Sequence, residues 1–119
     1  MAFFTYIQNN TGGSFDFNDK VTHIVVVEET TASRADARAE LLGIYFDGVR
    51  EGSDCACCGD RWSRAYGEGY EVPSLYGRPV EEAHLPFGDE TYPPMKWRAN
   101  GAEIYVYRNG VDNPEEFWK

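Results

Sequence analysis

Basic residues are few in this sequence: eleven lysines and arginines stand against twenty aspartates and glutamates, for a net charge of −9. This balance repels nucleic-acid phosphates and anionic membranes, so direct binding to nucleic acid is not expected. The sequence also has no apolar run of the about 18 residues that a membrane span needs, and its first residues lack the basic and apolar regions of a secretion signal. We therefore expect a cytoplasmic protein with no role at a membrane.

Cysteine and histidine are also scarce, and no familiar catalytic pattern is present. The chain has three cysteines, crowded into four positions, and two histidines. An odd number of crowded cysteines disfavours a disulfide framework and fits a reducing compartment. We find no Ser/His/Asp signature, no phosphate-cradling glycine loop and no His-Glu-x-x-His motif. The sequence leaves catalysis open but favours a protein that is not an enzyme.

The apolar residues that are present predict a single α+β domain. A length of 119 residues fits one domain over residues 1–119. Residues 2–8 predict a strand, and Phe15 and Phe17 alternate with polar residues as in a short second strand of a hairpin. Residues 21–28 are apolar on both alternating faces, which is typical of a central strand covered on both sides.

A helix is expected to follow this central strand. Thr31 or Ser33 can cap its beginning, an Ala/Leu stripe forms one face, and Gly43 can end it in the left-handed conformation. The stripe should pack on the valine-rich strand, and residues 44–46 should return as a strand of a β-α-β-like unit.

The second half of the chain is less regular. Glycine, proline and acidic residues interrupt any period over residues 47–94, so we expect a long irregular Cys/Gly/Pro-rich segment with short strands and a role in function. Residues 102–107 predict a strand whose tyrosines form an edge suited to pairing with a second copy, and Asn109 and Gly110 predict a hairpin turn. The expected fold is a small, mainly antiparallel sheet with one principal helix packed on it.

The most unusual stretch is a cysteine cluster. It consists of Cys55, Cys57 and Cys58, followed by Gly59. The Cys-x-x-Cys-Gly spacing has the shape of a zinc knuckle, with Cys57 as a third ligand and His84 or His23 as a fourth. Adjacent cysteines rarely bind one ion together, so three reduced, partly buried thiols are the alternative. A thiol-redox site is disfavoured because Gly59 and Asp60 open a helix poorly.

Cations and aromatic rings alternate just after the cysteines, at Arg61, Trp62, Arg64 and Tyr66. This chemistry suits a nucleotide, with rings stacking the base and guanidinium groups holding phosphate. In that interpretation Arg61→Ala abolishes binding and leaves the melting temperature nearly unchanged. In the alternative, Trp62 and Tyr66 pack over the cysteine turn, and the two arginines pair with nearby carboxylates.

Three stretches resemble a known family. AFFTYIQNNTGGSF at residues 2–15, GIYFDG at 43–48 and CCGDRW at 57–62 are similar to a family of small proteins encoded by tailed bacteriophages, including phages of cyanobacteria and marine bacteria. The resemblance covers most of the first 80 residues. Since that family carries no assigned activity, the resemblance implies no site residues. It implies a context, the cytoplasm of a host bacterium.

We therefore expect a phage accessory binding protein that interferes with a host process, above all antiviral defence. It would bind a host protein or sequester a nucleotide signal. Two alternatives remain open: a small zinc-knuckle-like module stabilised by metal, and a structural accessory protein of the virion. An enzyme acting on a phosphorylated metabolite needs a nucleophile or base that the sequence does not identify.

Overall fold

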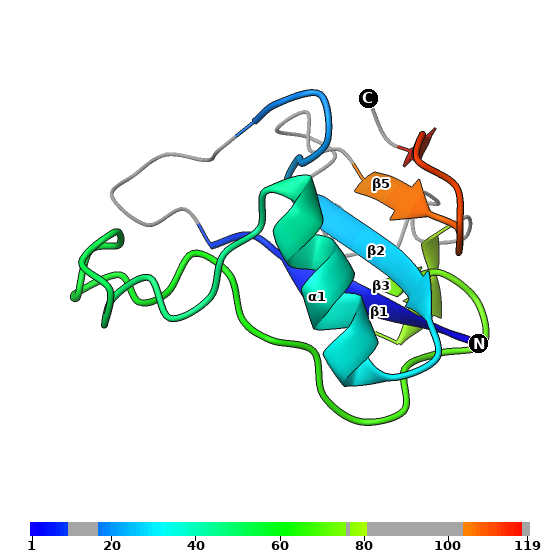
Figure 1. Cartoon of the computed structure of the whole chain (residues 1–119), viewed down its shortest axis with the longest axis horizontal. Coiled ribbons are helices and arrows are strands. Elements are labelled where there is room, and N and C mark those ends of the chain that lie inside the picture. The colour runs from blue at the N-terminus through cyan, green and yellow to red at the C-terminus, as the bar shows by residue number, and fades with distance from the viewer. Residues whose placement is uncertain (10–16, 76, 81–103, 118–119) are drawn as a thin grey trace, which may run out of the picture.

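A computed structural model describes residues 1–9, 17–75, 77–80 and 104–117 (Figure 1). It contains a four-stranded sheet in the order β1-β2-β5-β6, with one helix on one face and a separate two-stranded sheet, β3-β4. The elements are β1 (Ala2–Ile7), β2 (Ile24–Glu29), α1 (Ala32–Leu42), β3 (Ser74–Leu75), β4 (Arg78–Pro79), β5 (Ile104–Tyr107) and β6 (Glu115–Phe117).

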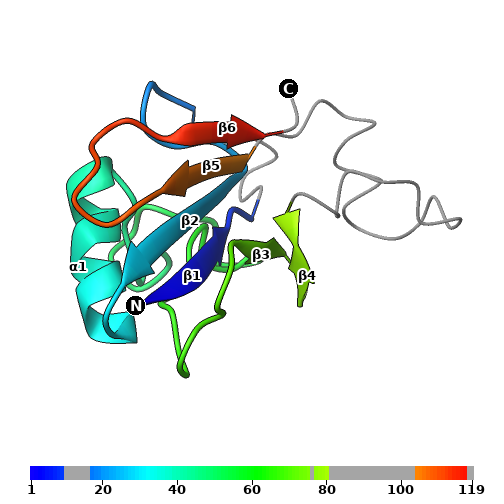
Figure 2. The ribbon, with the colours of Figure 1, turned by 90° about the vertical axis from the view of Figure 1, so that its right-hand side faces the viewer.

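Strand β2 is central, as the sequence predicts. It pairs antiparallel with β1 and parallel with β5, and β5 pairs antiparallel with β6 (Figure 2). Residues 24–27 are fully buried because helix α1 covers one face of the strand and the β3-β4 side covers the other. The expected α+β class, with a mainly antiparallel sheet and one packed helix, is confirmed.

Helix α1 begins and ends at the residues that the sequence indicates. The side chain of Thr31 accepts a hydrogen bond from the N–H of Arg34 at 3.2 Å, which satisfies one of the open donors of the first turn. Gly43 has φ 109° and closes the last turn. Ala35 and Ala39 are buried against the sheet, and their small size lets the helix lie close to β2.

The core has two parts, one on each face of the main sheet. On the helix side, residues of α1 and of the following segment pack on the sheet: Phe4, Tyr6, Val25, Val27, Ala35, Ala39, Ile44, Phe46, Trp62 and Tyr107. On the other side, β3 and Val80 cover the alternate residues of the strands: Phe3, Ile24, Val26, Leu75, Val80, Ile104 and Val106.

Two sequence-based expectations are wrong. Residues 44–46 do not form the return strand, because Ile44 and Phe46 turn into the helix-side core and β5 takes the position beside β2. The tyrosines of β5 do not form a free edge, because β5 lies between β2 and β6 and Tyr107 is buried. The turn at Asn109 and Gly110 joins β5 to β6 as predicted, whereas Phe15 lies outside the described residues.

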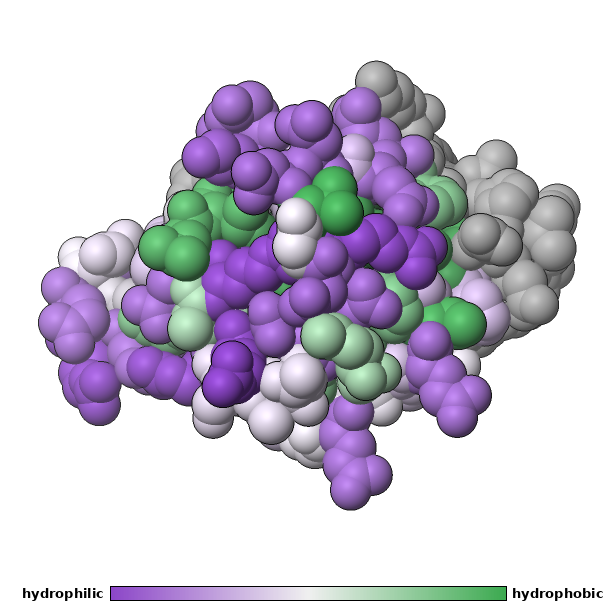
Figure 3. Space-filling model, turned by 45° about the vertical axis from the view of Figure 1, so that its right-hand side comes forward, coloured by the Kyte–Doolittle hydropathy of each residue, from purple (hydrophilic) through white to green (hydrophobic). Residues whose placement is uncertain are grey.

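The surface in Figure 3 is mainly hydrophilic, and hydrophobic residues occupy small separate areas of this face. A broad apolar docking surface is therefore not found on this side of the described structure. Among the described residues, no helix has the length and apolar character needed to cross a bilayer.

Candidate functional site

The three cysteines lie in a tight turn on the irregular segment between α1 and β3. The main-chain oxygen of Cys55 accepts hydrogen bonds from the N–H groups of Cys58, at 3.1 Å, and Gly59, at 3.0 Å. Gly59 adopts φ 88°, a left-handed conformation that a residue with a Cβ rarely takes. This segment extends to the left of helix α1 in Figure 1, away from the main sheet.

The turn brings the three sulfur atoms to one point. The Cys55 and Cys57 Sγ atoms are 2.8 Å apart, and the Cys57 and Cys58 Sγ atoms are 3.9 Å apart. All three lie within 4.8 Å of one another. A zinc–sulfur bond of about 2.3 Å places tetrahedral sulfur ligands about 3.8 Å apart, so small adjustments would let all three bind one ion. The cluster can therefore hold a metal ion.

The neighbouring thiols shift each other's pKa in opposite directions. Hydrogen bonds from the Cys57 thiol, and then from main-chain groups of Cys57 and Cys58, lower the pKa of Cys55 to about 7. Hydrogen bonds with the Cys55 and Cys58 thiols, and then the negative charge of these neighbours, raise the pKa of Cys57 to about 11. One thiolate is thus available near neutral pH before any metal binds.

Contacts that need no metal hold the turn in place. The side-chain amide of Asn9 donates to the main-chain oxygen of Cys58 at 2.7 Å, which ties the turn to the end of β1. The carboxylate of Asp60 accepts from the N–H of Val49 at 2.9 Å. The three sulfur atoms are therefore presented by a preformed loop, with Cys55 half-buried and Cys57 and Cys58 exposed.

Among the described residues, the group that could hold a metal ion contains the three cysteines and no histidine. His84 lies outside the described residues. The ring of His23 packs edge-on against Phe17, with centroids 4.7 Å apart.

Arg61 occupies the interior beside the cysteine turn. Its guanidinium donates to the side-chain oxygen of Gln8 at 3.1 Å and to the hydroxyl of Tyr45 at 3.0 Å. It also lies 3.9 Å from the carboxylate of Asp54, and the exposed side-chain fractions of Arg61 and Asp54 are 9% and 0%. This network links the residue that follows β1, the segment after α1 and the cysteine loop.

The other residues of the predicted nucleotide site do not share one surface with Arg61. Trp62 is 1% exposed and belongs to the helix-side core. Arg64 is on the surface, 2.7 Å from the carboxylate of Asp47 and above the ring of Phe46, and Tyr66 is 90% exposed. The nucleotide-binding role of this set stays a prediction, with Arg64 and Tyr66 as the members that a ligand can reach.

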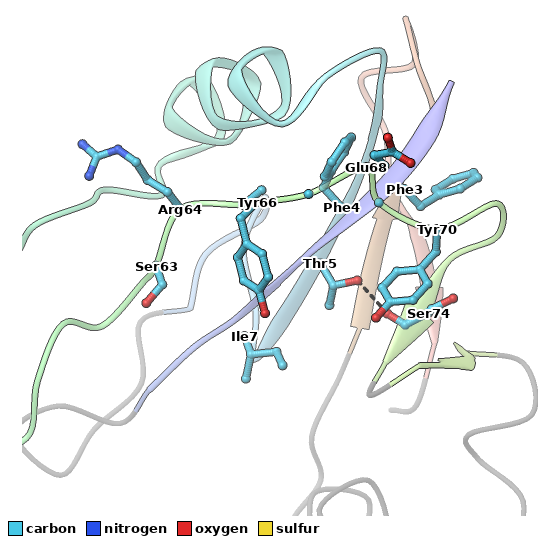
Figure 4. Close-up of a pocket in the computed structure, with 13 residues that line it drawn as sticks. Phe3, Phe4, Thr5, Ile7, Ser63, Arg64, Tyr66, Glu68, Tyr70 and Ser74 are labelled. Atoms are coloured by element: carbon cyan, nitrogen blue, oxygen red, sulfur yellow. Dashed lines mark hydrogen bonds between the residues drawn. The ribbon is translucent and has the colours of Figure 1, made fainter.

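Sequence reasoning missed a groove beside β1. The cavity has a volume of about 590 Å³ and lies between the edge of β1 and the segment 63–70, with Ser74 at one end (Figure 4). Arg64, Tyr66 and Tyr70 contribute to its wall. The one local signal was the Gly67-Glu68-Gly69 pattern, which indicates a bend but does not identify what it bends around.

Comparison with known protein families identifies a family that includes this chain. A family model described as "Domain of unknown function (DUF7296)" matches residues 1–113. No curated protein and no solved structure matches the chain.

Proposed function

The chain belongs to the DUF7296 family, and because the description of that family names no activity, we propose from the geometry that this protein binds a zinc ion at Cys55, Cys57 and Cys58. The observation that carries the proposal is the convergence of three sulfur atoms within 4.8 Å. Thiolates are ligands that zinc prefers, and a Cys-x-x-Cys-Gly turn is a frequent way to present two of them.

Three protein ligands leave one tetrahedral position for another group. Structural zinc sites are usually closed by four protein ligands, whereas sites with an open position accept water or a further ligand. His84 remains our candidate for a fourth protein ligand. If water fills the position instead, the ion can take a ligand from a partner molecule, since Cys57 and Cys58 are exposed.

The position of the cysteine turn indicates how zinc binding would affect the stability of the domain. Asn9 and Asp60 already tie the loop to the rest of the chain, and neither core cluster includes a cysteine. We therefore expect zinc to stabilise the loop and to raise the unfolding free energy by mass action, by about 2.7 kcal/mol at a hundredfold excess over the dissociation constant. Chelation should not unfold the whole domain, as it does a classical zinc finger.

The test is a zinc titration of the reduced, metal-free full chain in competition with a chromophoric chelator. We expect one ion per chain and the release of protons from the thiols. Cys55→Ser, Cys57→Ser and Cys58→Ser should each weaken binding by at least about tenfold, because a serine hydroxyl is a poor zinc ligand. Ala56→Ser, in the same turn, is the matched control and should bind as the parent does. Binding that is unaffected by the cysteine substitutions would refute the proposal.

Interference with a host process by capture of a protein or a nucleotide signal remains a second proposal. The observation that favours a protein partner is the groove beside β1. The test is a pull-down from bacterial lysate that compares the parent chain with a variant whose groove is blocked by a substitution. The Cys58→Ser variant separates any capture that depends on metal.

A further inference from the structure

The edge of the main sheet at β1 presents main-chain groups to the groove. The N–H of Gln8 donates to the oxygen of His23 at 2.8 Å, in register with the β1–β2 pairing. Because hydrogen-bonded pairs alternate along an antiparallel ladder, the even residues of β1 face β2. The N–H and C=O groups of Phe3, Thr5 and Ile7 therefore point away from the sheet.

At both ends of β1, the outer edge of the strand is hydrogen-bonded to the main chain of another segment. Phe3 and Tyr70 exchange both main-chain hydrogen bonds, at 2.8 and 2.9 Å. At the other end, the N–H of Asn9 donates to the oxygen of Arg61 at 2.8 Å. Between these attachments, the main-chain groups of Thr5 and Ile7 have no hydrogen-bond partner within the described part of the chain.

The segment that runs beside the outer edge of β1 bends away from this strand, because the segment is longer than the part of β1 that it spans. Residues 62–69 lie between the two attachments on one side, against residues 4–8 on the other. The N–H of Ala65 donates to the carboxylate of Asp36 in α1 at 2.9 Å, which holds the segment toward the helix. Gly67 and Gly69, with φ of 75° and 74°, then let the chain return to Phe3.

We propose that an extended, cationic peptide of another protein binds in this groove as an added strand, by hydrogen bonding to the main chain of Thr5 and Ile7. An open sheet edge with unpaired N–H and C=O groups is a template for strand addition. Four outward groups can pair with about three peptide residues, each advancing about 3.3 Å. The rings of Tyr66 and Tyr70 in the cavity wall provide contacts for its side chains.

Charge identifies the kind of peptide. The chain carries a net charge of −9, and Glu68 is exposed in the groove wall. The one arginine of that wall, Arg64, is 2.7 Å from Asp47, which neutralises it. A cationic peptide is attracted to this surface, whereas a second copy of the chain would bring another −9 against it. This inference does not depend on the proposed metal site.

The first experiment uses a capped hexapeptide of alternating lysine and valine as the probe, titrated into the isotope-labelled full chain. We expect shifts at the groove residues and slower amide hydrogen exchange at Thr5 and Ile7, with exchange at Val26, inside the sheet, unchanged. Methylation of the peptide nitrogens on one edge should weaken binding by at least about tenfold, and methylation on the other edge should not. A glutamate–valine peptide should bind at least about tenfold more weakly than the lysine form.

The second experiment removes the donor on the protein side. Thr5→Pro deletes an outward N–H without breaking the ladder to β2, as is tolerated in edge strands. Thr5→Val is the matched control, since both changes lose the hydroxyl that donates to the oxygen of Ser74 at 2.6 Å. Thr5→Pro should weaken peptide binding by at least about tenfold relative to Thr5→Val.

Three results would overturn the proposal. One is equal binding of the two edge-methylated peptides, a result that can be interpreted even if the Thr5→Pro variant does not fold. The second is equal affinity for the lysine and glutamate peptides. The third is a dimer in solution whose Thr5 and Ile7 amides are protected without peptide, because the edge would then be occupied by a second copy of the chain.

Discussion

Asp54 and Arg61 contact each other through both main chain and side chain: the carboxylate of Asp54 accepts from the N–H of Arg61 at 2.8 Å and lies 3.9 Å from its guanidinium. The side chain of Asp54 is completely buried, and its carboxylate also accepts a hydrogen bond from the hydroxyl of Tyr45. Arg61→Ala should therefore lower the unfolding free energy by about 3–5 kcal/mol, because it removes the cation beside a buried carboxylate together with the hydrogen bonds to Gln8 and Tyr45. Urea denaturation measures the loss.

Arg64→Ala is the matched control for this prediction. Its ion pair with Asp47 is exposed, with 54% of the Arg64 side chain accessible, so its loss should lower the unfolding free energy far less than the loss of Arg61 does. Equal losses of stability for the two variants would show that the buried network of Arg61 stabilises the fold no more than an exposed ion pair does. If Arg61→Ala instead abolished nucleotide binding and left stability unchanged, Arg61 would be a binding residue.

Gly67 and Gly69 form a second matched pair. Both have positive φ, so either alanine substitution should cost about 1–2 kcal/mol through backbone strain. Only at Gly69 would the new Cβ collide with its surroundings, 2.9 Å from the main-chain oxygen of Phe3, whereas at Gly67 nothing lies within 4 Å. We expect Gly69→Ala to cost at least about 1 kcal/mol more in thermal or urea unfolding. Indistinguishable variants would contradict the close approach of this segment to β1.

Alkaline pH should destabilise the fold through buried tyrosines. Burial raises the pKa of Tyr107 to about 12, and burial together with a hydrogen bond to Asp36 raises the pKa of Tyr6. The phenol of an unfolded tyrosine has a pKa of about 10. The contribution of these two buried tyrosines to the unfolding free energy is therefore intact below that pH and is lost as the pH rises toward 12. Urea midpoints measured from about pH 8 to about pH 11, the range in which the unfolded phenols ionise, give the slope of stability against pH. Tyr107→Phe should flatten it, and an unchanged slope in that variant would count against the prediction.

The cysteine turn should show unequal thiol reactivity in the reduced, metal-free protein. Cys55, with its pKa lowered to about 7 by its neighbours, should be alkylated at a rate that levels off above neutrality. Cys57, with its pKa raised to about 11, should react slowly and continue to accelerate with pH. Peptide mapping of iodoacetamide-labelled protein measures both rates. Identical pH profiles at the two residues would mean that their sulfur atoms do not interact.

Local patterns predicted the parts of the fold that local physics determines. The bounds of α1 follow from Thr31 and Gly43, whose conformations depend on their own side chains, and the central position of β2 follows from valines on both of its faces. Residues 44–46 have equally strong strand composition, but they pack into the core because β5 takes the position beside β2. That choice depends on a pairing far along the chain, which no short window contains.

The same distinction applies to the candidate site. The cysteine cluster was predictable because its three thiols lie within one turn. The burial of Arg61 was not, because its partners Gln8 and Tyr45 lie in distant segments, and a cation beside aromatic residues has the same local pattern on a surface or in an interior. The groove was invisible for a related reason: it is defined by main-chain groups of Thr5 and Ile7, which carry no sequence signal of their own.

The parallel pairing of β2 with β5 has a consequence for synthesis of the protein. Ile24 is in register with Ile104, a separation of 80 residues (104 minus 24). At about 5–20 residues per second, translation leaves β2 without this neighbour for several seconds. During that interval a valine-rich strand of high aggregation tendency has an unsatisfied side. Yield of native protein should therefore depend on prompt completion of the chain and on chaperones that cover β2 until β5 emerges from the ribosome.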